Sequence, residues 1–329
     1  MAEVRLQHPP LDAISQIRFA PIAGSGLLLV SSWDAHVRLY DAASNRLMGM
    51  KKHNKAILDC TFVQDTSRFL SVGLDARLVA CDFQTGQEFV IGHHDAAIRC
   101  VEFHQPTMQV FTGSWDRTLR AWDPRQAQRP VQHVSVGTKI FCMDTCNDKV
   151  VVGGADRNIH IYDIRNMDKP VDIRECSLKH QLRSIKVSPD QTAYAAGSVE
   201  GRVALEYIDA EENIRSRYAF KCHRTKDGAE EVIHPVNALA FNPKHGTFAT
   251  GGSDGVVCIW DGYAKKRLWK TDPFGTSISA LSFSADGSQM AIGVSYTFDD
   301  GEKYPCPTNE LIIRAVTDKE MEPKVQKAG

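Results

Sequence analysis

GSWDRTLRAWD, residues 113–123, is the clearest of four stretches that share one pattern: a turn with an Asp, a short β-prone run, then an aromatic residue and a closing Asp. The others are SSWDAHVRLYD at 31–41, GGADRNIHIYD at 153–163 and GGSDGVVCIWD at 251–261. Weaker copies end at Asp82 and Asp209. The closing Asp residues at positions 41, 82, 123 and 163 are 41, 41 and 40 residues apart. A repeat of about 40 to 45 residues with W-D endings is typical of the four-stranded blade of a β-propeller.

The chain is therefore predicted to form an all-β, seven-bladed propeller of WD repeats. Six copies are visible, and QMAIGVSY at 289–296 with LIIRAV at 311–316 begins a seventh, interrupted by an acidic excursion at 297–309. The N-terminal EVRL, residues 3–6, is expected to complete this last blade, because pairing both ends of the chain in one sheet leaves no free edge. We expect one propeller domain at 1–316 and a polar, flexible tail at 317–329.

Composition and charge argue against several function classes. The 329 residues carry 39 basic and 40 acidic side chains, so no overall field attracts nucleic acid or an anionic membrane. The sequence shows no signal-peptide core and no apolar run of the ~20 residues that a spanning helix needs. Nine scattered Cys residues suit reduced thiols in the cytosol or nucleus. Cys142 and Cys146 lack a second CxxC and are expected to be thiols of the core or of a blade face, so no metal and no cofactor is predicted.

The sequence also lacks the motifs of common enzyme classes: GxxxxGK[ST], GxSxG, HExxH and a Rossmann fingerprint after a strand. Asp residues recur at matching places in the tight turns, where they accept backbone or imidazole hydrogen bonds. His94, Asp116 and Trp122 are expected to form such a network in the third blade. We interpret it as scaffolding and predict a chain that is not an enzyme.

The top face is defined here as the face on which the turns between the second and third strands of each blade emerge, together with the links between blades. The residue before each turn acid projects there, which places Trp33 and Trp115 on this face. Indole is favoured where a partner can cover it, so we expect both to contact a partner. The alternative is that they pack into neighbouring blades.

Cations are predicted to gather on one rim of the same face. Three segments far apart in sequence supply them: SLKHQLR at 177–183, the turn EGRV at 200–203 and FKCHR at 220–224. Clustered cations in a balanced chain indicate an acidic or phosphorylated ligand, and Arg can bind two oxygens at once. The alternative is that Glu200 and Glu206 neutralise part of the cluster. Its members are Lys179, His180, Arg183, Arg202, Lys221, His223 and Arg224.

Two further segments, WDPR at 122–125 and YDIR at 162–165, fit the W-D-x-R pattern that lets some propellers serve as substrate receptors of cullin ligases. An Arg after the closing Asp can also simply pack on the rim of the blade. The two interpretations stay open.

The motifs together resemble one family. SSWD with VRLYD, EGRVALEYID, YAFKCHR and GGSDGVVCIWD with KKRL behind it look like the Bub-family WD-repeat proteins of the spindle checkpoint, in the branch that is not a kinase. The likeness covers nearly the whole chain, with departures at His180 and Leu182. The Rae/Gle mRNA-export factors are close cousins, since they share EGRVA, FKCHR and a link like SLKHQ.

The resemblance implies an adaptor of the nucleus and cytoplasm that is found at kinetochores in mitosis. Its implied partners are the GLEBS segments of Bub and BubR/Mad checkpoint kinases, phosphorylated Met-Glu-Leu-Thr repeats of the outer-kinetochore scaffold, and the assembly that inhibits the anaphase-promoting complex. Arg202 and Arg224 would hold the phosphate with Lys221 close by, and Trp33 would line the peptide groove. The further groove residues are expected to be Trp115, Lys179, Arg183 and His223. The alternative is a nucleoporin-binding export factor that uses the same groove.

Overall fold

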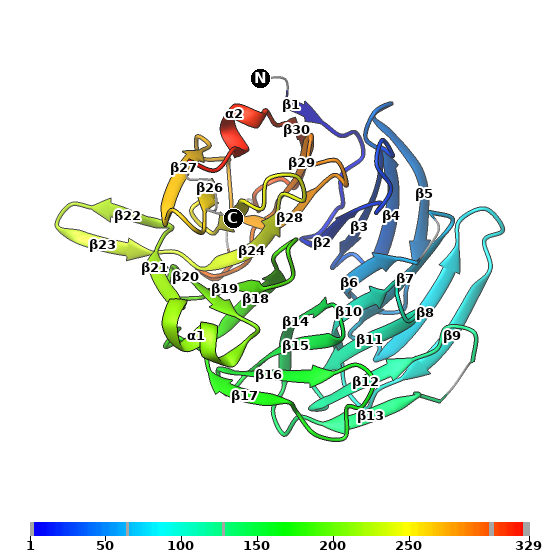
Figure 1. The fold of residues 1–329 in the computed structure, drawn as a ribbon. Helices are drawn as coiled ribbons and strands as arrows, with labels where there is room; N and C mark the ends of the chain where they lie inside the picture. The colour runs from blue at the N-terminus through cyan, green and yellow to red at the C-terminus, as the bar shows by residue number, and fades with distance from the viewer. Residues whose placement is uncertain (1–2, 64–65, 127–128, 303–305, 325–329) are drawn as a thin grey trace.

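A computed structural model describes residues 3–63, 66–126, 129–302 and 306–324, and it arranges the chain as a ring of seven four-stranded antiparallel sheets (Figure 1). The predicted seven-bladed propeller is thus confirmed. The first three blades, each from inner to outer strand, are β2 (Ile14–Phe19), β3 (Leu27–Ser32), β4 (His36–Asp41) and β5 (Arg46–Lys52); β6 (Ile57–Phe62), β7 (Arg68–Gly73), β8 (Arg77–Asp82) and β9 (Glu88–His93); and β10 (Ile98–His104), β11 (Gln109–Ser114), β12 (Thr118–Trp122) and β13 (Gln132–Ser135).

The next three blades follow the same order around the ring. They are β14 (Ile140–Cys146), β15 (Lys149–Gly154), β16 (Asn158–Asp163) and β17 (Asp172–Glu175); β18 (Leu182–Val187), β19 (Ala193–Ser198), β20 (Arg202–Tyr207) and β21 (Tyr218–Lys221); and β24 (Val236–Phe241), β25 (Phe248–Gly252), β26 (Val257–Asp261) and β27 (Lys266–Lys270).

The ring closes through the N-terminal strand, as the sequence predicts. Blade 7 consists of β28 (Ile278–Phe283), β29 (Gln289–Val294), β30 (Glu310–Ala315) and β1 (Glu3–Arg5). β1 pairs antiparallel with β30, with Val4 opposite Ile313. The Arg5 guanidinium also donates to Glu310 at 2.7 Å, which adds a charged contact at this seam.

The hydrophobic core is divided into seven clusters, and each joins the facing sheets of two neighbouring blades. Because each inner sheet face packs against a neighbouring blade, the second strands are buried along nearly their whole length, as expected for sheets covered on both faces. The contact can be very close. A Cβ added at Gly92 in blade 2 would lie 2.0 Å from the Trp122 ring of blade 3, so only glycine fits there.

Two elements are inserted into the repeat and lie outside the blades. Helix α1 (Ala210–Ser216) follows β20, and its N-cap is Asp209, whose carboxylate accepts from the Glu212 amide. A hairpin of β22 (Arg224–Asp227) and β23 (Glu230–Ile233) projects from the ring between blades 5 and 6 (Figure 1). Neither element is a part of the repeat.

The expected flexible tail differs from what the structure describes. Residues 317–324 include α2 (Asp318–Met321), whose Met321 side chain is buried against blades 6 and 7. The Thr247 hydroxyl donates to the Met321 carbonyl, and the Lys324 amide donates to Asp261. This segment therefore packs on the propeller, and residues 325–329 lie outside the described part. No described helix is long and apolar enough to cross a membrane.

Candidate functional site

A β-bulge recurs at the start of all seven inner strands. In each blade, the pairing with the second strand skips one residue. A bulge leaves the extra residue outside the ladder and turns its side chain away from the regular register. The seven skipped residues all line one cavity on the axis of the ring: Ser15, Leu58, Arg99, Phe141, Arg183, Asn237 and Ser279.

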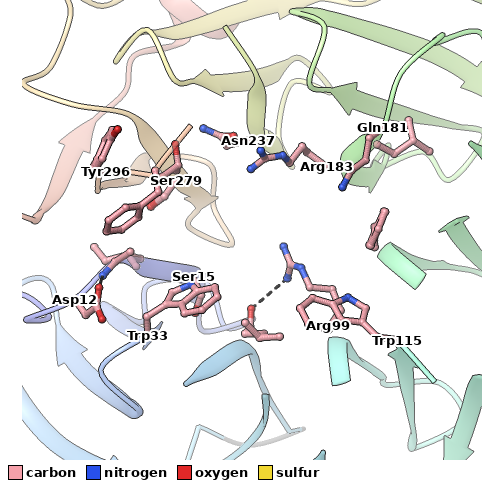
Figure 2. A pocket seen from close by; sticks show the side chains of 17 residues that line it. Asp12, Ser15, Trp33, Arg99, Trp115, Gln181, Arg183, Asn237, Ser279 and Tyr296 are labelled. Atoms are coloured by element: carbon pink, nitrogen blue, oxygen red, sulfur yellow. Dashed lines mark hydrogen bonds between the residues drawn. The ribbon is translucent and has the colours of Figure 1, made fainter. Parts of the chain in front are cut away.

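This cavity has a volume of about 620 Å³. Trp33 and Trp115 lie on its wall on either side of Arg99, and Arg183 lies across from them (Figure 2). Trp33 is 46% exposed, and the buried Nε1 of Trp115 has no hydrogen-bond partner among the described residues. An exposed indole at Trp33 and a half-buried indole with an unpaired N–H at Trp115 suit a site that a partner covers.

Two arginines on opposite sides of the cavity, Arg99 and Arg183, give its wall a positive charge. Arg99 donates to the Leu58 carbonyl at 3.2 Å, and none of the described carboxylates lies within ion-pair distance of it. Arg183 pairs with Asp299 of the excursion after β29, at 2.9 Å. Burial raises the pKa of Asp299, but hydrogen bonds from Ser253 and Thr297 and the charge of Arg183 outweigh this and lower it. Asp299 therefore stays ionised beside Arg183.

A second feature, the cation cluster, lies on the adjacent rim and consists of Lys179, Arg202, Lys221 and Arg224. Glu200 connects three of its members, Lys179, Arg202 and Arg224. Its carboxylate accepts from the Lys179 amide at 2.8 Å and lies 3.6 Å from Arg202 Nε, while its carbonyl accepts from Arg224 Nη2 at 3.0 Å. The predicted gathering of these distant residues at one edge is found.

Strand pairing and one glycine explain why they meet. Arg202 and Lys221 are direct partners in the β20–β21 ladder. Gly201, in the turn before β20, has φ of +60°, and a Cβ there would lie 2.9 Å from the Cys222 carbonyl and 3.0 Å from Ile233 Cγ2. Glycine thus allows the base of the β22–β23 hairpin to pack directly on the turn, which brings Arg224 beside Arg202.

His223 does not lie in the groove, contrary to the prediction. Its side chain is fully buried, with Nδ1 bonded to Asp254 at 2.9 Å and Nε2 to Thr250 at 2.7 Å. The Trp260 indole donates to the same Thr250 hydroxyl. Both ring nitrogens are satisfied inside blade 6, so His223 is a structural residue.

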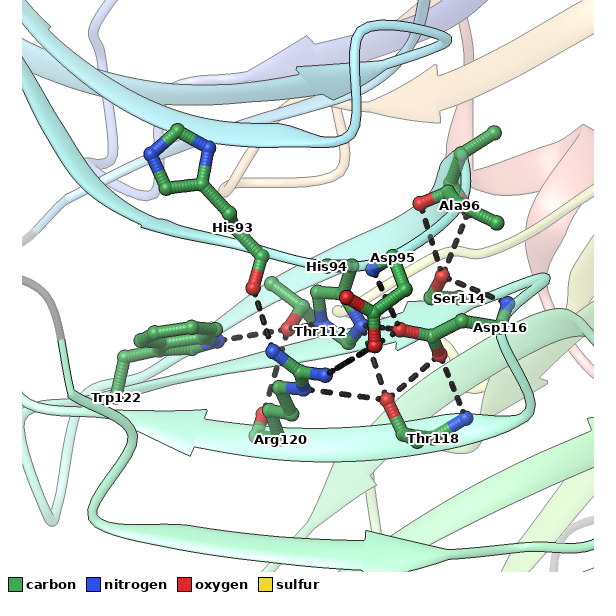
Figure 3. Close-up of polar contacts among 11 residues, drawn as sticks. His93, His94, Asp95, Ala96, Thr112, Ser114, Asp116, Thr118, Arg120 and Trp122 are labelled. Atoms are coloured by element: carbon green, nitrogen blue, oxygen red, sulfur yellow. Dashed lines mark hydrogen bonds and ion pairs between the residues drawn. The ribbon is translucent and has the colours of Figure 1, made fainter.

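The same network occurs in blade 3, where it was predicted. His94 Nδ1 bonds to Asp116 at 2.8 Å, Nε2 bonds to the Thr112 hydroxyl at 2.8 Å, and the Trp122 indole donates to that hydroxyl at 2.7 Å (Figure 3). Burial lowers the pKa of His94 even though Asp116 favours its charged form. A neutral histidine that donates to Asp116 and accepts from Thr112 fits this environment.

The sequence left open whether Glu200 and Glu206 neutralise the cation cluster, and whether the W-D-x-R arginines pack on their own blade rims. Glu200 does neutralise part of the cation cluster, but Glu206 is fully buried and accepts from Tyr194 and Ser177 instead.

The arginines of the two W-D-x-R segments are paired with acidic residues. Arg125 of the WDPR segment donates twice to its own Asp123, at 2.9 and 2.8 Å. Arg165 of YDIR is likewise paired with Asp163 and Asp148. Both arginines thus bind within their own blade rims.

Farther along the axis of the ring, past the cavity, a buried network of charged side chains connects the inner strands across the central channel. Glu102 accepts from Arg18 and, at 3.0 Å, from Lys186, which also lies 3.2 Å from Asp144. Burial opposes ionisation, but Arg18 and Lys186 outweigh it and lower the pKa of Glu102. These four residues come from blades 1, 3, 4 and 5. Among the described residues, no group of His, Cys, Asp and Glu is placed to hold a metal ion.

Arg99, Phe141, Gln181 and Asn237 line the cavity but were not identified from the sequence. A signal for most of them exists. Each inner strand begins with an apolar residue, then the bulged residue, then a second position before the next apolar residue, as in IRCV at 98–101 and VNAL at 236–239. The bulged position is polar in five of the seven blades, repeats at the blade period and marks the axis of the ring: Ser15, Arg99, Arg183, Asn237 and Ser279.

Comparisons with known proteins agree with this architecture. A model of the family "WD domain, G-beta repeat" matches residues 86–123 and 220–261. The chain is 47% identical to the mitotic checkpoint protein BUB3.1 of Arabidopsis thaliana, over 97% of this chain and 94% of that protein. It is 40% identical to the mitotic checkpoint protein bub-3 of Caenorhabditis elegans, over 98% and 96%.

More distant similarity extends to other propellers. The chain is 34% identical to a poly(A)+ RNA export protein of Schizosaccharomyces pombe, over 99% of this chain and 94% of that protein. A solved structure of U3-55K matches with a TM-score of 0.80 at 16% identity, over 94% of this chain and 98% of that one, which shows a shared fold alone.

Proposed function

Because the chain belongs to the Bub3 family of mitotic checkpoint proteins, we propose that it is a non-enzymatic adaptor whose top face binds two peptide segments at once. One is a phosphorylated Met-Glu-Leu-Thr repeat of the outer-kinetochore scaffold, held by the cation cluster. The other is an acidic GLEBS segment of a Bub or BubR/Mad checkpoint kinase, held in the tryptophan-lined cavity. The adaptor would thereby recruit the kinase to unattached kinetochores.

The observation that carries the phosphate site is that three separate segments meet at Glu200, through the Lys179 amide and the Arg202 and Arg224 guanidinium groups, with Lys221 opposite Arg202 in the strand ladder. Arg202 and Lys221 are 36% and 57% exposed, so a ligand can reach them. Arg224 is more covered, at 13%, and its buried Nε has no partner among the described residues. Phosphate, with three acceptor oxygens, can accept from several such donors together.

The GLEBS proposal rests on the adjoining cavity. Residues 179–183 connect the two sites, because Lys179 contacts Glu200 while Gln181 and Arg183 line the cavity. Arg99 and Arg183 would favour acidic side chains, and Trp33 and Trp115 would supply apolar contact area. A peptide that occupies the cavity can therefore lie next to one that occupies the cation cluster.

The phosphate site predicts a large loss of binding in Arg224→Ala and Arg202→Glu. Each charge-assisted hydrogen bond contributes about 1.5–3 kcal/mol, which corresponds to about 10- to 150-fold in affinity for the Ala variant. Isothermal calorimetry with phosphorylated and plain peptides measures this. Arg215→Ala, an exposed arginine of α1 outside the cluster, should bind like the wild type.

Circular dichroism should show that both binding variants keep the propeller fold. Equal affinity of the wild type for phosphorylated and plain peptide would contradict the proposed function.

A role as mRNA-export factor is the second candidate, supported by the 34% identity to the Schizosaccharomyces pombe export protein. Both roles would use a GLEBS segment, so binding of an isolated segment does not separate them. Purification of native partners from mitotic and interphase cells does. Checkpoint kinases and the kinetochore scaffold in mitotic samples support the first role, and nucleoporins as the main partners support the second.

A further inference from the structure

An internal carboxylate occupies the cation cluster. Glu231, on β23 of the projecting hairpin, accepts from Arg224 Nη1 at 2.6 Å, and Lys221 Nζ lies 3.9 Å from the same oxygen. The hydrogen bond and the charge of Arg224 lower the pKa of Glu231, which is therefore ionised at neutral pH. Arg224 and Lys221, two of the four cations of the cluster, are thus already close to a carboxylate of this chain.

This pairing limits access to Arg224. The guanidinium has Nη1 on Glu231 and Nη2 on the Glu200 carbonyl, and its side chain is only 13% exposed. Glu231 is 49% exposed and belongs to a hairpin that contacts the ring at its base. The contact with Glu231 is therefore the outer one, and a ligand that arrives from solvent meets it first.

We propose that Glu231 is a built-in competitor that any anionic ligand, a phosphopeptide included, must displace from Arg224. The inference rests on the proposed phosphate site and adds a residue that raises the intrinsic affinity a ligand needs in order to bind there. A Glu or Asp of a peptide would form the same carboxylate–guanidinium contact with Arg224 that Glu231 already makes. Because Glu231 is tethered, its effective concentration at Arg224 is in the millimolar range, and the peptide must compete against it. A phosphate dianion carries more charge and more acceptor oxygens, so it can displace the carboxylate.

The test is Glu231→Gln, which removes the charge and keeps the shape. Loss of a partly exposed ion pair should tighten the phosphopeptide by roughly two- to fivefold. A peptide with Glu in place of phosphothreonine should tighten by a similar factor, because both ligands need the same opened Arg224. Glu230→Gln is the matched control, since Glu230 is the exposed neighbour on the same strand and makes no ion pair within the described residues.

A double-mutant cycle makes the assignment specific. In the Arg224→Ala background, Glu231→Gln should change phosphopeptide affinity by less than about 1.5-fold, because the competing pair no longer exists. An equal gain in Glu231→Gln and Glu230→Gln, or a gain that persists without Arg224, would overturn the proposal.

Titration with inorganic phosphate separates this proposal from the proposed function. The amide shifts of residues 224–233 should respond at lower phosphate concentration in Glu231→Gln than in the wild type, whatever peptide the protein prefers. An identical phosphate response in the two proteins would also reject the competitor.

Discussion

His94 and His223 hold equivalent places in blades 3 and 6, yet only His94 was predicted to be structural. The separation between the histidine and its Asp partner explains the difference. It is 22 residues for His94 and Asp116 but 31 for His223 and Asp254. The nine extra residues correspond to the inserted hairpin, which hides the shared pattern. With the spacing changed and cations on both sides of it, His223 resembles a rim residue in sequence alone.

Buried histidines predict acid sensitivity. Burial lowers the pKa of His94, His104 and His160, whereas histidine in the unfolded chain titrates near ~6.5. Below that pH the unfolded state binds more protons than the folded state, so the free energy of unfolding falls as pH falls. The effect is at most about 1.4 kcal/mol per pH unit for each histidine.

Urea unfolding at pH 7.5 and 5.5 measures this loss. A free energy of unfolding that stays constant between the two pH values would contradict the expected titration.

At the scale of elements, the turn before β20 and the base of the hairpin act as one unit. Gly201 has a positive φ and no space for a Cβ, because the Cys222 and His234 carbonyls lie within 3.1 Å of where the Cβ would be. The geometry of Arg202 and Arg224 depends on this contact. The hairpin edge carries no other strand, so its position is set at its base.

Gly201→Ala should therefore weaken phosphopeptide binding as well as stability. The left-handed conformation alone costs an L-residue about 1–2 kcal/mol, and the clash with the two carbonyls adds to it. Gly228→Ala at the hairpin tip is the matched control, with φ of +59° and no neighbour within 4 Å. Thermal unfolding and peptide calorimetry should show that Gly201→Ala loses more of both properties. Equal losses in the two variants would show that the close contact does not position the site.

The repeat period was enough to predict the blades, their order and the closure by residues 3–6, because each blade repeats one alternation of apolar residues and turns. The rim cations could be predicted to meet, since the inter-blade link, the turn and the end of the outer strand that carry them all emerge on the same face. The hairpin and α1 could not be predicted, because they break the period. The role of Arg99 was missed because a bulge, and not the alternation, directs its side chain into the cavity.

At the scale of the whole molecule, the ring is held both by apolar blade interfaces and by charges inside the channel. Lys186 of blade 5 bonds to Glu102 of blade 3 and Asp144 of blade 4, and Arg18 of blade 1 reaches the same Glu102. These contacts join blades that are not all sequence neighbours. They resist any opening of the ring that would separate the inner strands.

Lys186→Met should destabilise the protein by about 3 kcal/mol, because it leaves Asp144 and Glu102 with less compensation in a buried site. Chemical denaturation measures the change. Lys149→Met, which removes a lysine paired with Asp148 outside the channel, should cost less than about 1 kcal/mol. A loss for Lys186→Met no larger than that of Lys149→Met would show that the channel charges do not stabilise the ring.

The β1–β30 seam has a consequence for biogenesis. Arg5 and its partner Glu310 are 305 residues apart, so at about 5–20 residues per second the first strand waits roughly 15 to 60 s after its synthesis before a partner exists. During that interval the nascent chain has an unpaired first strand and an open edge on its newest blade. Chaperones that shield strand edges are expected to act on this protein while it is still attached to the ribosome.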